Sequence, residues 1–109
     1  IRRSRDAVAR EGGAFLVVVF PIAMQAAGDP GYPDTPQRDI ARRCAEAGIL
    51  CLDLLPAFRR EGGWNLFARP DFAHLSELGH RVTAEAITER IKAMDAAGRT
   101  SSGPGRSAP

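Results

Sequence analysis

The chain has 109 residues, of which 15 are Lys or Arg and 13 are Asp or Glu, so its formal net charge is only +2. This length fits one domain and excludes two. A hydrophobic content of 44% with 26% charged residues excludes a wholly disordered chain. The basic pairs at positions 2–3, 42–43 and 59–60 are scattered and lack interleaved aromatic residues, so we expect no nucleic-acid partner.

The sequence carries no clear signal for membrane insertion or for a disulfide framework. Its longest apolar run, residues 14–24, has about half of the roughly 20 residues that a membrane-spanning helix needs, and Pro21 interrupts it. We therefore expect no membrane span. Cys44 and Cys51 do not form a C-x-x-C motif, and we interpret both as small buried residues.

The first third of the chain reads as a helix, a strand and a long loop. Residues 1–11 have a helical pattern that Gly12 and Gly13 end. Residues 14–20 are continuously apolar, which is typical of a parallel strand covered on both faces. Residues 21–34 are rich in Pro and Gly and predict a loop.

The middle of the chain repeats this order. Thr35 as N-cap and Pro36 at the first helical position predict a helix that ends at Gly48. A second apolar strand follows at residues 49–55 and ends at Pro56. Residues 56–60 allow one helical turn, and residues 64–73 are predicted to be irregular.

The last predicted element is a helix from Ser76, its expected N-cap, to about Met94. Ala84, Ile87, Ile91 and Met94 recur at intervals of three and four residues, which predicts the face that packs on the core. Residues 98–109 are poor in apolar side chains, and we expect this tail to be disordered.

Alternation of helices and strands is the pattern of an α/β fold with a parallel sheet. Two parallel strands are too few for a stable sheet on their own. We therefore expect residues 1–97 to be the C-terminal part of a larger α/β/α sandwich, whose upstream part is missing from this sequence.

One cluster of residues has a pattern suited to catalysis: Asp71 and His74, three residues apart just before the last helix. In such a loop the carboxylate can turn back onto the Nδ1–H of the imidazole, fix its tautomer and stabilise its charged form. Nε2 is then available to accept a proton from a hydroxyl nucleophile. A D-x-x-H spacing often occurs by chance, but its position between the last strand and the last helix makes it a more specific indication of catalysis.

Residues 65–71 and 74–87 resemble the C-terminal block of the SGNH/GDSL hydrolase family, which is similar in its D-x-x-H, its following Gly79-His80 pair and its alanine-rich helix. The strands at 14–20 and 49–55 also resemble the last two strands of that family. The resemblance implies a flavodoxin-like three-layer sandwich with a parallel sheet.

The same resemblance implies a serine ester hydrolase or acyltransferase that needs no metal or other cofactor and acts on a small-molecule or carbohydrate ester. It assigns catalytic roles to Asp71, as the orienting acid, and to His74, as the general base. The nucleophile block G-D-S and the oxyanion-hole motifs of the family are not in this sequence. We therefore expect these 109 residues alone to be inactive.

Other interpretations of the same residues remain open. His80 shares a helix face with Ala84 and Ile87, and we expect it to pack inward. A metal site of Asp71, His74 and His80 is disfavoured, because residues six apart do not share a helix face. Trp64, Phe67 and Phe72 fit either a substrate pocket or a hydrophobic cluster. The whole chain is alternatively a non-catalytic α/β domain that binds a ligand or partner.

Overall fold

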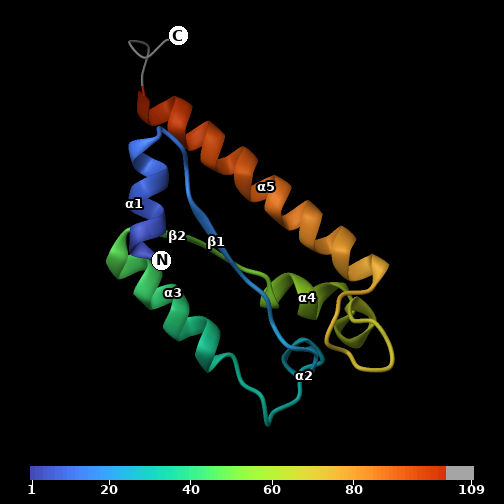
Figure 1. Ribbon diagram of the computed structural model, residues 1–109. Coiled ribbons are helices and arrows are strands. Elements are labelled where there is room, and N and C mark those ends of the chain that lie inside the picture. The colour runs from blue at the N-terminus through green and yellow to red at the C-terminus, as the bar shows by residue number, and fades with distance from the viewer. Residues whose placement is uncertain (103–109) are drawn as a thin grey trace.

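In the computed structural model, which describes residues 1–102, the two apolar runs pair as parallel strands (Figure 1). Strand β1 (Leu16–Val19) lies beside β2 (Leu50–Asp53), with Leu16 opposite Leu50 and Val19 opposite Asp53. The predicted α/β class and the parallel pairing are confirmed. Each strand has four residues and is shorter than its apolar run, because each run also includes residues that flank the strand on both sides.

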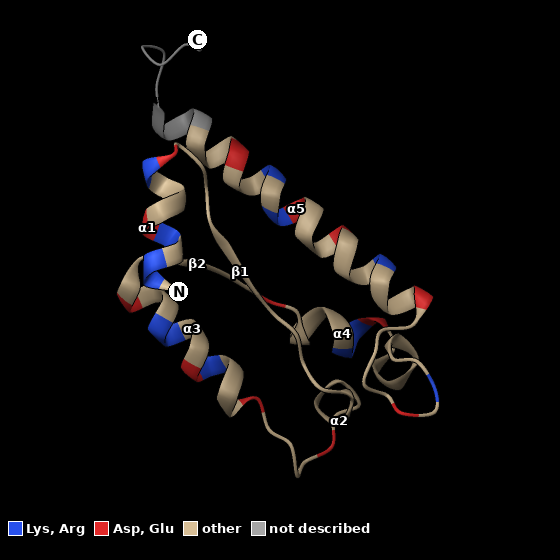
Figure 2. Ribbon diagram, viewed as in Figure 1, with Lys and Arg blue, Asp and Glu red and all other residues tan. Residues whose placement is uncertain are grey.

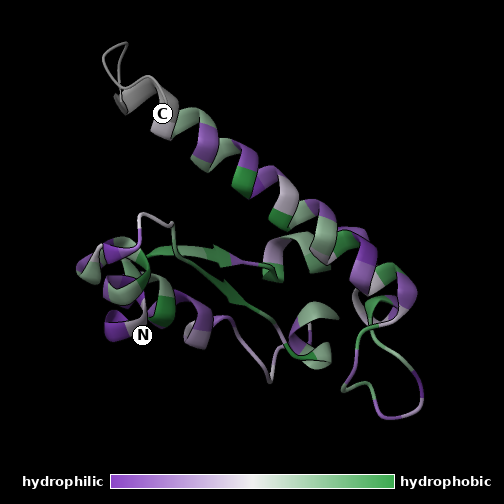
Figure 3. Ribbon diagram, turned by 45° about the horizontal axis from the view of Figure 1, so that its top comes forward, coloured by the Kyte–Doolittle hydropathy of each residue, from purple (hydrophilic) through white to green (hydrophobic). Residues whose placement is uncertain are grey.

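Helices lie on both faces of this strand pair. Helix α3 (Thr35–Ala47) connects the strands and packs on β2, where the thiol of Cys51 interacts with that of Cys44. Side chains alternate between the faces of a strand, so Leu52 points the other way, toward the core that α4 (Leu55–Glu61) and α5 (Glu77–Ser102) cover. The view in Figure 3 shows α5 above the two apolar strands.

The strands are less buried than a central sheet requires. Every residue of β1 is only partly buried, and Leu50 at the start of β2 is exposed. The expectation that the strand at residues 14–20 is covered on both faces is therefore wrong for this chain. Among the described residues each strand has a single neighbour, so both outer edges of the pair carry unpaired backbone groups.

Three further elements differ from the predicted ones. The loop at residues 21–34 contains the one-turn helix α2 (Ala23–Ala26). The segment expected to be irregular begins with the 3₁₀ turn η1 (Gly63–Leu66). Helix α5 passes Met94 and includes residues 98–102 of the predicted tail, whose remainder lies outside the described residues.

Helix α5 packs with a face that matches the predicted one only in part. Gly79, Val82 and Thr83 are buried; of the predicted face, Ile87 and Met94 are partly buried, whereas Ala84 and Ile91 are exposed. His80 is also exposed, so its predicted inward packing is wrong. The cause is tertiary: the first turn of the helix lies against the carbonyl of Leu66, and this contact sets the rotation of the whole helix.

The core lies at the carboxyl ends of the strands, between α2, α4, η1 and α5. Its buried members are Ala23, Ala26, Leu54, Phe58, Leu66, Phe67 and Val82. The rings of Phe58 and Phe67 meet edge to face, with their centroids 5.7 Å apart. Burying each such aromatic side chain removes a large apolar area from water, which makes this cluster the main stabilising unit.

Helix α1 (Arg2–Arg10) is basic and lies near the end of α3 (Figure 2). None of its residues is buried. Its described attachment to α3 is the guanidinium of Arg5, whose Nη1 donates to the carbonyl oxygens of Ala47 at 2.8 Å and Gly48 at 3.2 Å. These carbonyls belong to the end of α3, where the helix itself provides no donors.

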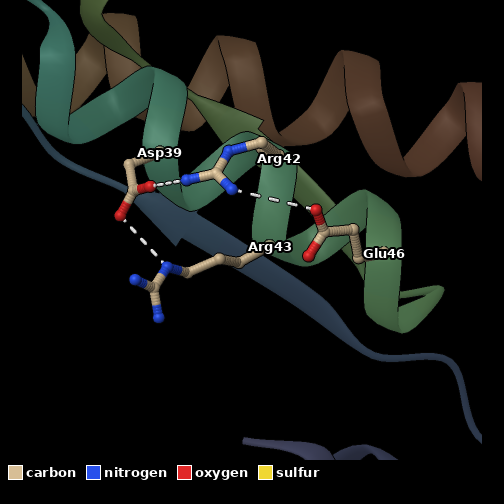
Figure 4. A network of polar contacts seen from close by, with 4 residues as sticks. All are labelled: Asp39, Arg42, Arg43 and Glu46. Atoms are coloured by element: carbon tan, nitrogen blue, oxygen red, sulfur yellow. Dashed lines mark hydrogen bonds and ion pairs between the residues drawn. The ribbon is translucent and has the colours of Figure 1, made fainter.

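The exposed face of α3 carries a chain of ion pairs (Figure 4). The carboxylate of Asp39 accepts one hydrogen bond from Arg42 and a second, 3.0 Å long, from Nε of Arg43. The guanidinium of Arg42 also lies 3.9 Å from the carboxylate of Glu46. Such exposed pairs contribute little to stability individually. They place carboxylates beside the arginines of this face.

The molecule is elongated. Its Cα radius of gyration is 16.4 Å, and its principal extents are 52, 26 and 20 Å. A compact chain of this length has a radius of gyration of about 13 Å. Within the described part of the chain, no helix is both long enough and apolar enough to cross a lipid bilayer.

Candidate functional site

Asp71 and His74 lie in a loop whose two ends are joined by backbone hydrogen bonds. Phe67 and Leu75 form an antiparallel bridge, and the N–H of Ala68 donates to the carbonyl oxygen of His74 at 2.7 Å. The N–H of Ser76 donates to Leu66 at 3.0 Å. The loop is therefore closed at its base between residues 66–68, at the end of η1, and residues 74–76, directly before α5.

Ser76 anchors this loop to helix α5. Its hydroxyl donates to the carbonyl oxygen of Asn65 at 2.6 Å and accepts the N–H of Gly79 at 3.1 Å. The second contact is that of an N-cap side chain with the third residue of its helix. The predicted N-cap role of Ser76 is confirmed.

Gly79 allows the helix to approach the loop closely. A Cβ atom at this position would lie 2.0 Å from the carbonyl oxygen of Leu66, a distance that no side chain tolerates. The close packing of α5 on the loop therefore explains why residue 79 is a glycine. It brings the start of α5 against the backbone that carries the loop.

The two candidate catalytic side chains are in contact. Nδ1 of His74 lies 3.5 Å from Oδ2 of Asp71, while Oδ1 of the same carboxylate accepts the N–H of Ala73 at 3.0 Å. The Nδ1–Oδ2 distance exceeds that of a normal hydrogen bond. Catalytic contacts are often longer before substrate binds, so this geometry is compatible with an acid that orients a base.

The charge of Asp71 is stabilised locally. The N–H of Ala73 is the largest influence that lowers the pKa of the Asp71 carboxyl below its ordinary 3.8, and the nearby His74 lowers it further. The carboxylate therefore stays ionised at neutral pH, as an acid that orients imidazole requires. Because Asp71 is exposed, solvent screens its interaction with His74.

The site is open to solvent. The side chain of His74 is 83% exposed and that of Asp71 is 56% exposed. The loop projects from the side of the core where both strands end, the side on which open α/β sheets bind ligands (Figure 1). His80 lies beyond it on α5 and makes no ion pair with Asp71.

Two aromatic residues beside the pair have a structural role that the sequence indicated only in general terms. The rings of Trp64 and Phe72 meet edge to face, with centroids 4.9 Å apart and planes at 70°. Phe72 has φ of 51°, a left-handed conformation that is rare for a bulky residue. A Phe between Asp71 and His74 gives no sequence signal for such backbone strain.

Other ionisable groups do not extend the site. The thiol of Cys51 lies at the other end of the strand pair, where burial and its contact with Cys44 raise its pKa from 9.0 to about 11. A thiol of this pKa is protonated at neutral pH and is a poor nucleophile. Among the residues that the structure describes, no three His, Cys, Asp or Glu side chains gather as metal ligands.

Comparison of the chain with protein-family models, with curated proteins and with solved structures finds no match.

Proposed function

We propose that this chain supplies the acid and base of a serine ester hydrolase of the SGNH/GDSL type. The observation that supports the proposal most directly is the contact between the Asp71 carboxylate and Nδ1 of His74 in a loop closed by backbone hydrogen bonds. With Nδ1 facing the carboxylate, Nε2 is the nitrogen that can exchange a proton with a reacting group.

The reaction follows from these roles. His74 takes the proton of a serine hydroxyl as its oxygen attacks the carbonyl carbon of a small acyl or acetyl ester. The resulting imidazolium is stabilised by Asp71 and returns the proton to the departing alcohol. Water then repeats the two steps on the acyl-serine and releases the acid and the free serine.

The nucleophile in this proposal comes from outside these 109 residues. Ser76 is close in sequence to His74, but its hydroxyl is committed to Asn65 and Gly79. The strand pair, with unpaired outer edges, is suited to extension by the further strands of a three-layer sandwich. A segment that adds such a strand can also bring the serine to His74.

The test is the hydrolysis of p-nitrophenyl acetate by two polypeptides. One is the 109-residue chain, and the other carries the same residues together with the reading frame that precedes them. We expect no saturable turnover by the first and serine-dependent turnover by the second. In the second, His74→Ala should remove almost all activity, because the hydroxyl loses its proton acceptor.

Asp71→Asn in the longer polypeptide should lower kcat by about 10²–10⁴-fold, as in other triads that lose the orienting acid. The double variant should be hardly worse than His74→Ala, because the two residues act as one unit. His80→Ala is the matched control, since it removes an exposed imidazole nearby. Full activity in His74→Ala, or loss of activity only in His80→Ala, would refute the assignment.

A further inference from the structure

The two outer edges of the strand pair differ in how they are covered. The N–H of Leu54 donates to the carbonyl oxygen of Val19 at 3.0 Å, so the backbone groups of Val19 face β2. Because this direction alternates along a strand, the backbone groups of Val18 on β1 and of Cys51 on β2 face outward. Nη2 of Arg90 donates to the outward carbonyl oxygen of Cys51 at 2.8 Å and so caps the edge of β2. Within residues 1–102 no such side-chain bond reaches β1, whose edge is therefore the more open one.

The open edge of β1 also lacks the usual protection against pairing. Strand edges are commonly protected by a charged side chain, especially Lys, or by a proline within the strand. Residues 12–28 are the longest stretch of this sequence without a charged side chain, and Pro21 lies beyond the end of β1. Both strands are apolar along their length (Figure 3), and Phe20, directly after β1, is 49% exposed. The edge is thus suited to pairing with another uncharged strand.

An apolar pocket continues this edge at the carboxyl end of β1. The pocket has a volume of about 430 Å³ and is lined by Val19, Phe20 and Ile22, and none of its lining residues is charged. Its amide groups are already satisfied, because Gln25 and Gln37 exchange two hydrogen bonds of 2.8 Å. The pocket therefore suits an uncharged, apolar side chain that is brought by a strand lying along β1.

A second copy of this chain meets both requirements, because its own β1 is an uncharged strand with an open edge. In a dimer with two-fold symmetry the two strands pair antiparallel, and the same surface serves both copies. With the axis at Val18, this residue faces its counterpart, and Leu16 of each copy faces Phe20 of the other. Side chains alternate along a strand, so Phe15 lies on the same face as Val19. This register carries Phe15 of each copy toward the pocket of the other.

We propose that β1 is the interface of a homodimer, in which two copies join their open edges antiparallel and form one four-stranded sheet. Each copy then inserts Phe15 into the pocket of the other. The dimer supplies the additional strands that a two-stranded sheet needs for stability. The inference does not depend on the proposed function. A further strand supplied by a longer polypeptide would compete for the same edge, so the dimer is tested on the 109-residue chain.

Sedimentation velocity of the 109-residue chain, from micromolar to millimolar concentration, measures its mass. We expect a species of twice the chain mass that forms as the concentration rises. Amide hydrogen exchange followed by NMR locates the interface. The N–H of Val18 should be protected in the dimer and should lose this protection on dilution, whereas that of Val19, which faces β2, should be protected at both concentrations. A monomer over the whole range, or exchange at Val18 that does not depend on concentration, would overturn the proposal.

Variants separate this interface from other modes of association. Phe20→Lys should raise the dissociation constant of the dimer by about tenfold or more, because it brings a charge into an apolar edge. Val18→Pro should have a similar effect, because it removes an N–H that faces outward and leaves the bonds between β1 and β2 in place. Ile91→Lys is the matched control, since Ile91 is 50% exposed but lies on α5, and it should leave the dimer unchanged.

An unaltered dimer in both β1 variants, with circular dichroism showing them folded, would refute the role of this edge. Equal weakening by Ile91→Lys would refute it as well. The outcomes also separate the dimer from the proposed function. A dimer of the 109-residue chain without ester hydrolysis by the longer polypeptide would retain the dimer and reject the hydrolase. Hydrolysis that depends on His74, together with a monomeric 109-residue chain, would retain the hydrolase and reject the dimer.

Discussion

The pKa of the Asp71 carboxyl is lowered by its nearest neighbours in the chain, the N–H of Ala73 first and His74 second, and not by burial. One of its oxygens accepts the N–H of Ala73, and the other faces Nδ1 of His74. Both partners are within three residues, so the contact is set by the local turn. It can persist even where the rest of the molecule changes.

The lowered pKa of Asp71 predicts a specific pH dependence of stability. Its carboxylate interactions should contribute fully above its unfolded pKa and be lost as the pH falls through the lower folded pKa. Asp71→Asn keeps an oxygen for the N–H of Ala73 but removes the charge. The variant should therefore be slightly less stable than the wild type at about pH 7, and the difference should disappear as the pH falls through the folded pKa.

Urea unfolding of both proteins at a series of pH values measures this difference. Both side chains are exposed, so we expect it to be small. Ser76→Ala provides a comparison, because its capping hydroxyl does not titrate and its effect should be independent of pH. A difference for Asp71→Asn that grows as the pH falls would contradict the assigned direction of the pKa shift.

At the same scale, the sequence predicts some side-chain positions and not others. The Asp71–His74 contact is predictable because a three-residue spacing in a turn allows it whatever surrounds the loop. The predicted inward packing of His80 was wrong because it depends on the rotation of α5, which the contact with the carbonyl of Leu66 sets. The left-handed conformation of Phe72 was not predictable, since it is rare for a bulky residue and no local sequence pattern indicates it.

Among the secondary-structure elements, α5 depends most on a single close approach. Its first turn meets the carbonyl of Leu66 at Gly79 and then continues over the core with Val82. The periodic apolar stripe along the same helix predicted this face only in part. Ile87 and Met94 of the stripe are partly buried, whereas Ala84 and Ile91 are exposed.

Gly79→Ala should destabilise the protein strongly. The added Cβ collides with backbone rather than with a movable side chain, so the loop or the helix must shift, at a cost of roughly 2–4 kcal/mol. Chemical denaturation measures this change. Gly98→Ala in the same helix is the matched control, because its Cβ would meet no atom within 4 Å.

The control should be neutral or stabilising by up to about 1 kcal/mol, the difference in helix propensity between Ala and Gly. Equal effects of the two substitutions would mean that α5 does not lie against Leu66 as described. The short elements α2 and η1 could not be predicted in the same way, because a single turn has no periodicity to recognise.

At the scale of the whole molecule, the chain has one well-packed end and one loosely attached end. The buried aromatic residues and the candidate site are at the carboxyl ends of the strands. The opposite end contains α1, which has no buried residue, and the exposed start of β2. The α/β class was predictable from the order of the apolar runs. This uneven packing was not, since it depends on which tertiary contacts form between the elements.

The attachment of α1 through Arg5 has a consequence for the cooperativity of unfolding. A helix held mainly by one guanidinium can open without disturbing the aromatic core, so its amide hydrogens should exchange with deuterium far faster than those of α4. Arg5→Ala should abolish the remaining protection in α1 and leave that of α4 unchanged, whereas the control Arg3→Ala should alter neither. Exchange of α1 and α4 at a single common rate would show that one cooperative unit spans the chain. Separate rates would mean that the first helix can unfold and refold many times while the loop of Asp71 and His74 stays intact.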